Sequence, residues 1–279
     1  MSFRELLANL RRGRLGVQSS DHRQDGRSPT DETTLSTDDR IEFICDREEY
    51  GAIPDPEPAS KHLPDWYREL PHQASGHDER ISLDDKTARK CAPLLDAMTA
   101  GWIMKLPYET EVSIDRSTKQ MQVRSRGSEE LATIFPWRAV GGEQSDLAYP
   151  PIQINLRWIV KVPPGYSLFV VPPLNRDEYA DLFQPYAGFI DADKRFNQMN
   201  TVLQWQRDYT GVLDAGTPLV QIIPFRRDGM ISQALTRPLR DEERIARERD
   251  GVEKEVSANR YMEDLWEPKS TRMIPWEGE

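Results

Sequence analysis

The stretch from Trp102 to Phe225 constrains the fold most, because short apolar runs alternate there with turn residues and no helix-length amphipathic segment separates them. Its clearest part runs from Ile152 to Trp158, where large apolar residues alternate with Gln, Asn and Arg. This period of two is typical of a strand with one buried face and one wet face. Since parallel strands need crossover helices, the stretch predicts a mainly β, antiparallel domain.

Turn residues divide this stretch into an expected six to eight strands. The polar residues 115–118 separate two strand-like runs and predict a first hairpin. A second hairpin is predicted over residues 152–171, where Pro164 followed by Gly165 favours a type II turn. We expect these strands to pack as a β-sandwich or jelly-roll-like core with a few short helices, one of which stops at Gly101.

Changes in composition divide the chain into residues 1–40, 41–228 and 229–279. The first part is predicted to be a flexible N-terminal arm, because residues 17–40 contain almost nothing apolar to offset the entropy of ordering. It opens with apolar residues at helical spacing, namely Phe3, Leu6, Leu7 and Leu10. Two interpretations stay open for this arm: a peptide that grips a neighbouring subunit, and a plain disordered tail. Residues 41–228 form the expected β-rich core.

The third part, 229–279, carries dense alternating charge and predicts a long charged helix followed by an extended tail. A narrow apolar stripe runs along the helix and includes Ile245, Val252 and Val256, and Gly251 is a place where the helix can break. The stripe either packs along one edge of the sheet or meets another subunit. Trp266 and Trp276 are expected to anchor the tail.

Charge and hydropathy exclude several classes of partner. The chain has 47 acidic and 37 basic residues and a formal charge of -10, which disfavours strong binding to nucleic acid or to an anionic membrane surface. No run approaches the roughly 20 apolar residues of a membrane-spanning helix, and no signal-peptide core opens the sequence. We therefore expect no membrane association and an intracellular location.

Metal and cofactor signatures are also missing from the sequence. The four histidines lie upstream of Trp102, so the predicted core strands lack the two His ligands of the metal-dependent oxygenases built on a double-stranded β-helix. Cys45 and Cys91 belong to no CxxC pair and are expected to be buried free thiols. No phosphate-binding glycine loop occurs. We expect neither a metal nor a cofactor.

Carboxylates are the remaining candidates for chemistry. Asp191 and Asp193 in GFIDAD, with Asp177 upstream, could form a paired acid and base or a divalent-cation site. The other interpretation is structural, because aspartates at strand ends satisfy backbone donors in turns.

Several segments carry a family resemblance: CAPLLDAMTAGW, FPW at 135–137, VPPGYSLFVVPPLNR, AGFIDAD and AGTPLVQIIPF. Over roughly residues 85–228 the chain resembles a family of uncharacterised β-rich proteins encoded by tailed viruses of bacteria and archaea. The resemblance implies a virion component, found in the particle or the host cytoplasm, and carries over no catalytic residue. The leading hypothesis is a structural, head- or neck-associated protein that assembles with itself and with other virion proteins. The alternative is a host-takeover enzyme or small-ligand binder with its site around Asp177, Asp191 and Asp193.

Overall fold

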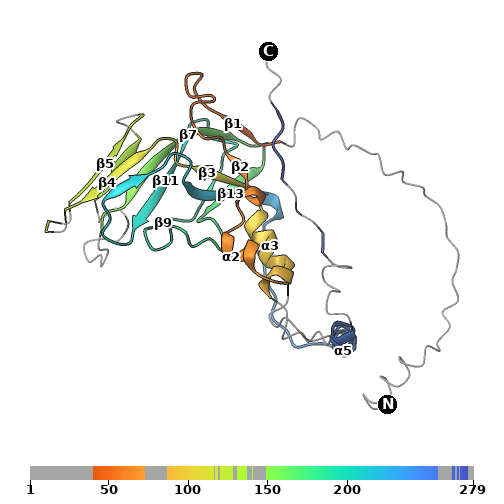
Figure 1. Ribbon diagram of the computed structural model, residues 1–279. Coiled ribbons are helices and arrows are strands. Elements are labelled where there is room, and N and C mark those ends of the chain that lie inside the picture. The colour runs from red at the N-terminus through yellow and green to blue at the C-terminus, as the bar shows by residue number, and fades with distance from the viewer. Residues whose placement is uncertain are drawn as a thin grey trace. The chain divides into compact units, whose positions relative to one another are not determined.

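The computed structural model describes residues 40–72, 87–115, 117–118, 120–127, 131–136, 140, 149–256, 266–267, 269 and 271–275. By its internal contacts the chain divides into Met1–Ser36, which lies outside these residues, and Thr37–Glu279. The described part is mainly β, as the sequence predicts (Figure 1).

Thirteen strands in the described residues form three antiparallel sheets. The first sheet has the order β1 (Glu42–Ile44), β7 (Ile152–Lys161), β11 (Gln198–Trp205) and β9 (Phe183–Pro185), with β6 (Ala132–Ile134) also paired to β7. The second has the order β10 (Gly188–Ile190), β8 (Tyr166–Val171), β13 (Pro218–Arg226), β3 (Trp102–Lys105) and β2 (Glu57–Pro58). The third joins β12 (Gly211–Leu213), β4 (Thr110–Ile114) and β5 (Met121–Ser125). The strand number exceeds the expected six to eight because many of these strands have only two or three residues.

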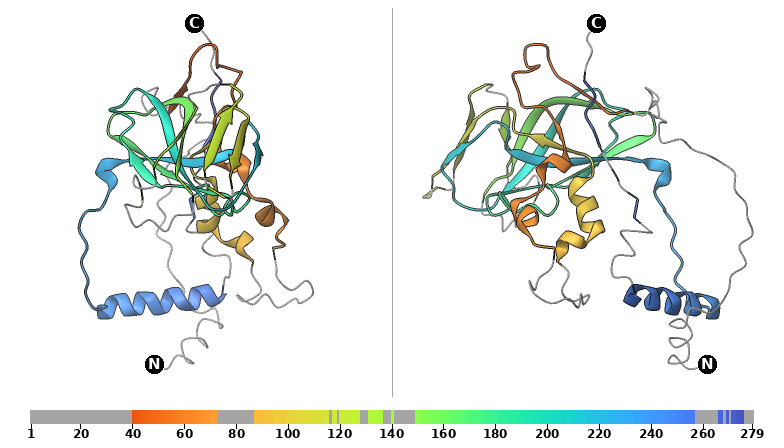
Figure 2. Two further views of the ribbon diagram at one scale, coloured as in Figure 1. Left: turned by 90° about the vertical axis from the view of Figure 1, so that its left-hand side faces the viewer. Right: turned by 45° about the vertical axis from the view of Figure 1, so that its right-hand side comes forward.

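The sheets face one another in a sandwich-like arrangement (Figure 2). Buried residues of all three sheets belong to one hydrophobic cluster. β7 buries every second residue over most of its length, which confirms the alternation seen in the sequence. Its Leu156 and Trp158 belong to the same buried cluster as Leu168 and Ile222 of the second sheet and Val112 of the third. Burial of this shared apolar surface is the main force that holds the three sheets together.

The first predicted hairpin is confirmed, since β4 pairs with β5 across residues 115–120. The second is wrong. The Pro163–Tyr166 turn forms and Gly165 has a φ of 86°, but β7 and β8 lie in different sheets. β7 already has β1 and β6 on one side and β11 on the other, so no edge remains for β8. A turn reverses the chain, whereas pairing depends on which edges are free.

Within the described residues the helices are few and mostly short. They are η2 (Ala59–His62), α2 (Asp65–Glu69), η4 (Ala88–Lys90), α3 (Ala92–Thr99), η5 (Arg227–Gly229) and α5 (Asp241–Val256). After α3 the chain turns at Gly101, where φ is 68° and a Cβ would lie 1.9 Å from the carbonyl oxygen of Ile222. Only glycine allows α3 and β13 to approach so closely. α5 continues through Gly251 without a break.

Candidate functional site

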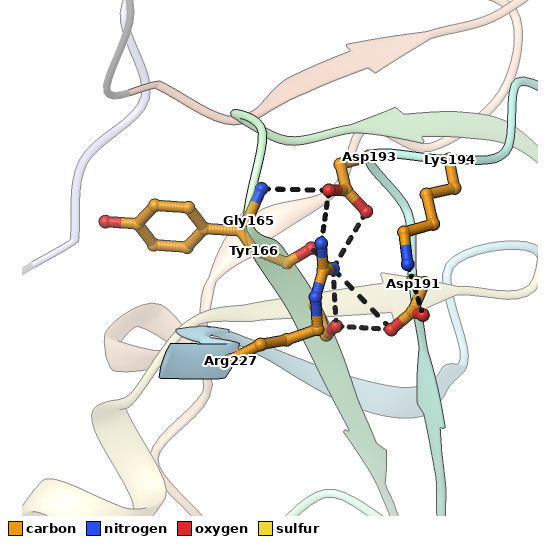
Figure 3. A network of polar contacts seen from close by, with 7 residues as sticks. Gly165, Tyr166, Asp191, Asp193, Lys194 and Arg227 are labelled. Carbon is orange, nitrogen blue, oxygen red and sulfur yellow. Dashed lines mark hydrogen bonds and ion pairs between the residues drawn. The ribbon is translucent and has the colours of Figure 1, made fainter. Parts of the chain in front are cut away.

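Arg227 stands at the centre of a polar network at one end of the second sheet (Figure 3). It is the first residue of η5, directly after β13. One of its terminal nitrogens donates to the Tyr166 carbonyl (2.6 Å), the Ser167 hydroxyl (3.0 Å) and the Asp193 carboxylate (2.8 Å). The other terminal nitrogen donates to the second Asp193 oxygen at 2.5 Å. The backbone N–H of Arg227 donates to the Gly165 carbonyl. The guanidinium thus ties the end of β13 to the start of β8.

Two aspartates complete this network, which we call the clasp (Arg227, Asp191, Asp193, Ser167 and Gly165). Asp193 also accepts the backbone N–H of Gly165 at 2.9 Å, and hydrogen bonds from Arg227 hold the pKa of its carboxyl far below the ordinary value. The Asp191 carboxylate accepts from the Ser167 hydroxyl at 2.6 Å and lies 3.6 Å from Arg227. The bond from Ser167, supported by the charge of Arg227, lowers the pKa of Asp191 as well.

The clasp suits a structural role better than acid–base chemistry. A general acid at neutral pH needs a raised carboxyl pKa, whereas both carboxyls here are stabilised as anions. Asp177 does not join them: it is exposed in the loop after β8, where its carbonyl accepts the N–H of Ala180. Within the described ranges, no three His, Cys, Asp or Glu side chains converge as a metal site.

An aromatic patch lies on the outer face of the same sheet and consists of Phe169, Phe189, Ile223 and Phe225. Phe189 of β10 is opposite Phe169 of β8, and their ring centroids are 4.9 Å apart in a stacked arrangement. Phe225 of β13 meets Phe189 edge-on at 5.4 Å. Phe189 is 63% exposed, whereas Phe169, Ile223 and Phe225 are half-buried, so Phe189 is the most open part of the patch in the described chain.

The other half of this outer face is covered by α3. Gln221, two residues before Ile223 on β13, is only 1% exposed. Its amide nitrogen donates to the carbonyls of Ala97 (2.9 Å) and Ala100 (2.6 Å), and its amide oxygen accepts the N–H of Leu174 (2.9 Å). A fully used side-chain amide therefore fastens α3 and its C-terminal end to the sheet.

Beyond the clasp, residues 230–240 form neither helix nor strand, and each of them is exposed. We call this segment the strap, to distinguish it from the N-terminal arm. It includes Ile231, which is 92% exposed, Leu235, which is 83% exposed, and the less exposed Met230 and Leu239. The clasp thus fixes the point at which an exposed apolar segment leaves the sheet and leads to α5 (Figure 2).

The predicted contact residues fall into three groups. Ile245 of α5 is 55% exposed. Trp266 donates its indole N–H to both carboxylate oxygens of Asp96 on α3 at 3.0 Å, so this residue contacts its own chain. The other contact residues have side chains outside the described residues: Phe3, Leu6, Leu7, Leu10, Val252, Val256 and Trp276.

The cysteine prediction needs a correction. Cys45 is half-buried but Cys91 is exposed, because it precedes α3 at the surface instead of lying on a strand. In the described residues, no helix is both long and apolar enough to cross a bilayer.

The sequence prediction missed the aromatic patch and the strap. Both have a visible signal: the three phenylalanines occur in SLFVV, GFI and IIPF, and Ile231, Leu235 and Leu239 recur every fourth residue. Nothing in one sequence says which face of a strand stays open, because apolar residues on either face look the same.

Comparison with known proteins leaves the family open. No family model matches the sequence, and no curated protein matches it. Among solved structures, the native EIAV dUTPase is similar over 61% of this chain and 94% of its own, with 12% identity and a TM-score of 0.28. A likeness at this level carries no argument for function, and the mainly β class rests on the strands themselves.

Proposed function

We propose that this protein is a structural and interaction protein of a tailed virus particle, associated with its head or neck, that assembles through its β-rich core and its terminal segments. The observation that carries the assembly role is the strap, which exposes Ile231 and Leu235 almost completely directly after a firmly held clasp. Exposed apolar segments of this kind mark sites of protein contact, because water is a poor environment for them.

The viral setting is supported by the sequence resemblance over roughly residues 85–228. Its motifs coincide with elements that frame the proposed contacts: VPPGYSLFVV contains the turn before β8 and Phe169, and GFIDAD contains Phe189 and both clasp aspartates. Copies of the same chain and other virion proteins are the proposed partners, in the particle or in the host cytoplasm.

The alternative of an enzyme or ligand binder at the acidic residues gains no support from the clasp. Both carboxylate oxygens of Asp193 accept hydrogen bonds, from Arg227 and from the Gly165 N–H. Asp191 accepts a hydrogen bond from Ser167 and forms an ion pair with Arg227. A carboxylate that binds a ligand must release its present partner, and one that acts in acid–base catalysis must gain or lose a proton.

Quantitative mass spectrometry of density-purified particles from infected cells tests the proposal. We expect this protein at a fixed stoichiometry relative to a portal or capsid reference. Deleting residues 1–40 should lower its incorporation while far-UV circular dichroism of the purified variant stays that of a folded β protein. Abundance in infected cells together with absence from particles would contradict the proposal.

A further inference from the structure

In an extended strap, three aliphatic side chains project from one side, where they alternate with the polar side chains of Gln233 and Arg237. Ile231, Leu235 and Leu239 follow one another at intervals of four residues. Side chains an even number of residues apart project from the same side of an extended chain. All three aliphatic side chains are exposed, so the described part of the chain leaves them uncovered.

The aromatic patch lies at an open edge of the second sheet. β10 is the first strand in the order of that sheet, with β8 on its inner side. Phe189 is the middle residue of β10 and stands in register with Phe169, which in turn stands in register with Ile223 of β13. An edge strand accepts another extended chain, and a chain added here would continue this apolar row.

Building on the proposed assembly role, we infer that the strap of a second copy of this chain docks in extended form along β10, with Ile231 and Leu235 against the aromatic patch. Each copy carries both halves of the contact, the strap and the patch. The exposure of Ile231 (92%), Leu235 (83%) and Phe189 (63%) shows that one chain does not join its own two halves. Residues 229–240 span about 40 Å when extended, which is enough to reach a neighbouring sandwich.

Charge favours a second copy as the occupant. From Gly229 to Arg240 the chain has no acidic residue and a formal charge of +2, of which Arg237 is paired with Glu243 of α5. Because the whole chain has a formal charge of -10, the residues outside this segment together carry -12. A strap that carries Arg240 and no acidic residue is attracted to such an acidic body, whereas two bodies without the strap would repel each other.

A complementation experiment with the full chain tests this inference. Sedimentation velocity measures self-association of the wild type, of Phe189→Ser, which damages the patch, and of the double variant I231S/L235S, which damages the strap. We expect the wild type to associate and each variant to associate at least about tenfold more weakly. Mixing the two variants should recover part of the association, because a mixed pair retains one intact strap against one intact patch.

Phe196→Ser is the matched control, since Phe196 is 69% exposed but is not part of the patch. Its association should equal that of the wild type. Circular dichroism checks that every variant folds; if one does not, Phe189→Leu and Ile231→Ala replace it as milder changes at the same places.

Three results would overturn the inference: a wild type that stays monomeric at the highest concentration reached, variants that associate as the wild type does, or a mixture that associates no better than its components. Because the experiment uses purified protein, its failure is distinct from that of the proposed function. If the protein is present in particles but the two variants do not complement each other, only the strap contact is contradicted. If the variants complement each other but the protein is absent from particles, only the virion role is contradicted.

Discussion

The two halves of the outer face of the second sheet differ in how far other segments of the chain cover them. Over β13 and β3, α3 covers the sheet and Gln221 fastens it with two hydrogen bonds, to the carbonyls of Ala97 and Ala100. Over β10 and β8, Phe189 is 63% exposed and its stacking partner Phe169 is half-buried. The covered half is complete within one chain, whereas the open half has the composition of a core surface without its cover. This difference is the basis of the inference that a second copy covers the open half.

The same substitution in the two halves should give the largest contrast. Gly101→Ala on the covered side places a Cβ 1.9 Å from the Ile222 carbonyl oxygen at a φ of 68°, and should lower the free energy of unfolding by about 3 kcal/mol. Gly188→Ala on β10 meets nothing within 4 Å and should change it by less than about 1 kcal/mol. Urea denaturation followed by tryptophan fluorescence measures both. Equal losses would mean that the halves are not distinct.

Removing the polar fastening should have the next largest effect. Gln221→Leu leaves the carbonyls of Ala97 and Ala100 and the N–H of Leu174 without their partner in a buried place, at an expected cost of about 2 kcal/mol. Gln122→Leu, on an exposed position of β5, is the matched control and should be nearly neutral. Thermal unfolding compares the two, and an unchanged midpoint for Gln221→Leu would show that α3 does not depend on this amide.

Phe189→Ser should have a smaller effect on the stability of the isolated chain. It removes ring contacts with Phe169 and Phe225 but exposes no core, so we expect a loss of about 1 kcal/mol. Urea titrations at low protein concentration, where copies do not associate, measure this term. A loss as large as that of Gly101→Ala would mean that the patch is already part of the core of one chain.

The clasp should make the free energy of unfolding depend on pH in acid but not near neutrality. In the folded chain the pKa of the Asp193 carboxyl lies below its ordinary value of 3.8. The carboxylate therefore contributes stability that is complete above pH 3.8 and is lost as the pH falls through the folded pKa. The stability gap between wild type and Asp193→Asn should be constant from pH 7 to about 5 and narrow below about 4. Urea titrations across this range measure it, with Asp177→Asn as the control. A gap that does not narrow in acid would contradict the clasp.

Local periodicity predicted the elements of this fold better than their partners. The alternation along β7, the helix that stops at Gly101 and the first hairpin follow from residues close in sequence. The predicted pairing of β7 with β8 failed because β1, β6 and β11 occupy both sides of β7, and β1 lies more than a hundred residues away in sequence. Such competition for an edge is invisible in a turn motif.

The candidate site shows the same limit. The sequence singled out Asp191 and Asp193 as neighbours and offered a structural interpretation beside the catalytic one, but Arg227, which decides between them, lies 34 residues from Asp193. The patch was missed because its phenylalanines come from three separate strands, and only the register of β10, β8 and β13 brings them together.

Hydrogen–deuterium exchange of the full chain at increasing protein concentration tests most directly whether the open half is covered by a second copy. Peptides that contain β10 and peptides that contain residues 230–240 should become protected together as the concentration rises, while the peptide that contains α3 stays unchanged. Exchange in β10 and in the strap that does not depend on concentration would contradict the account.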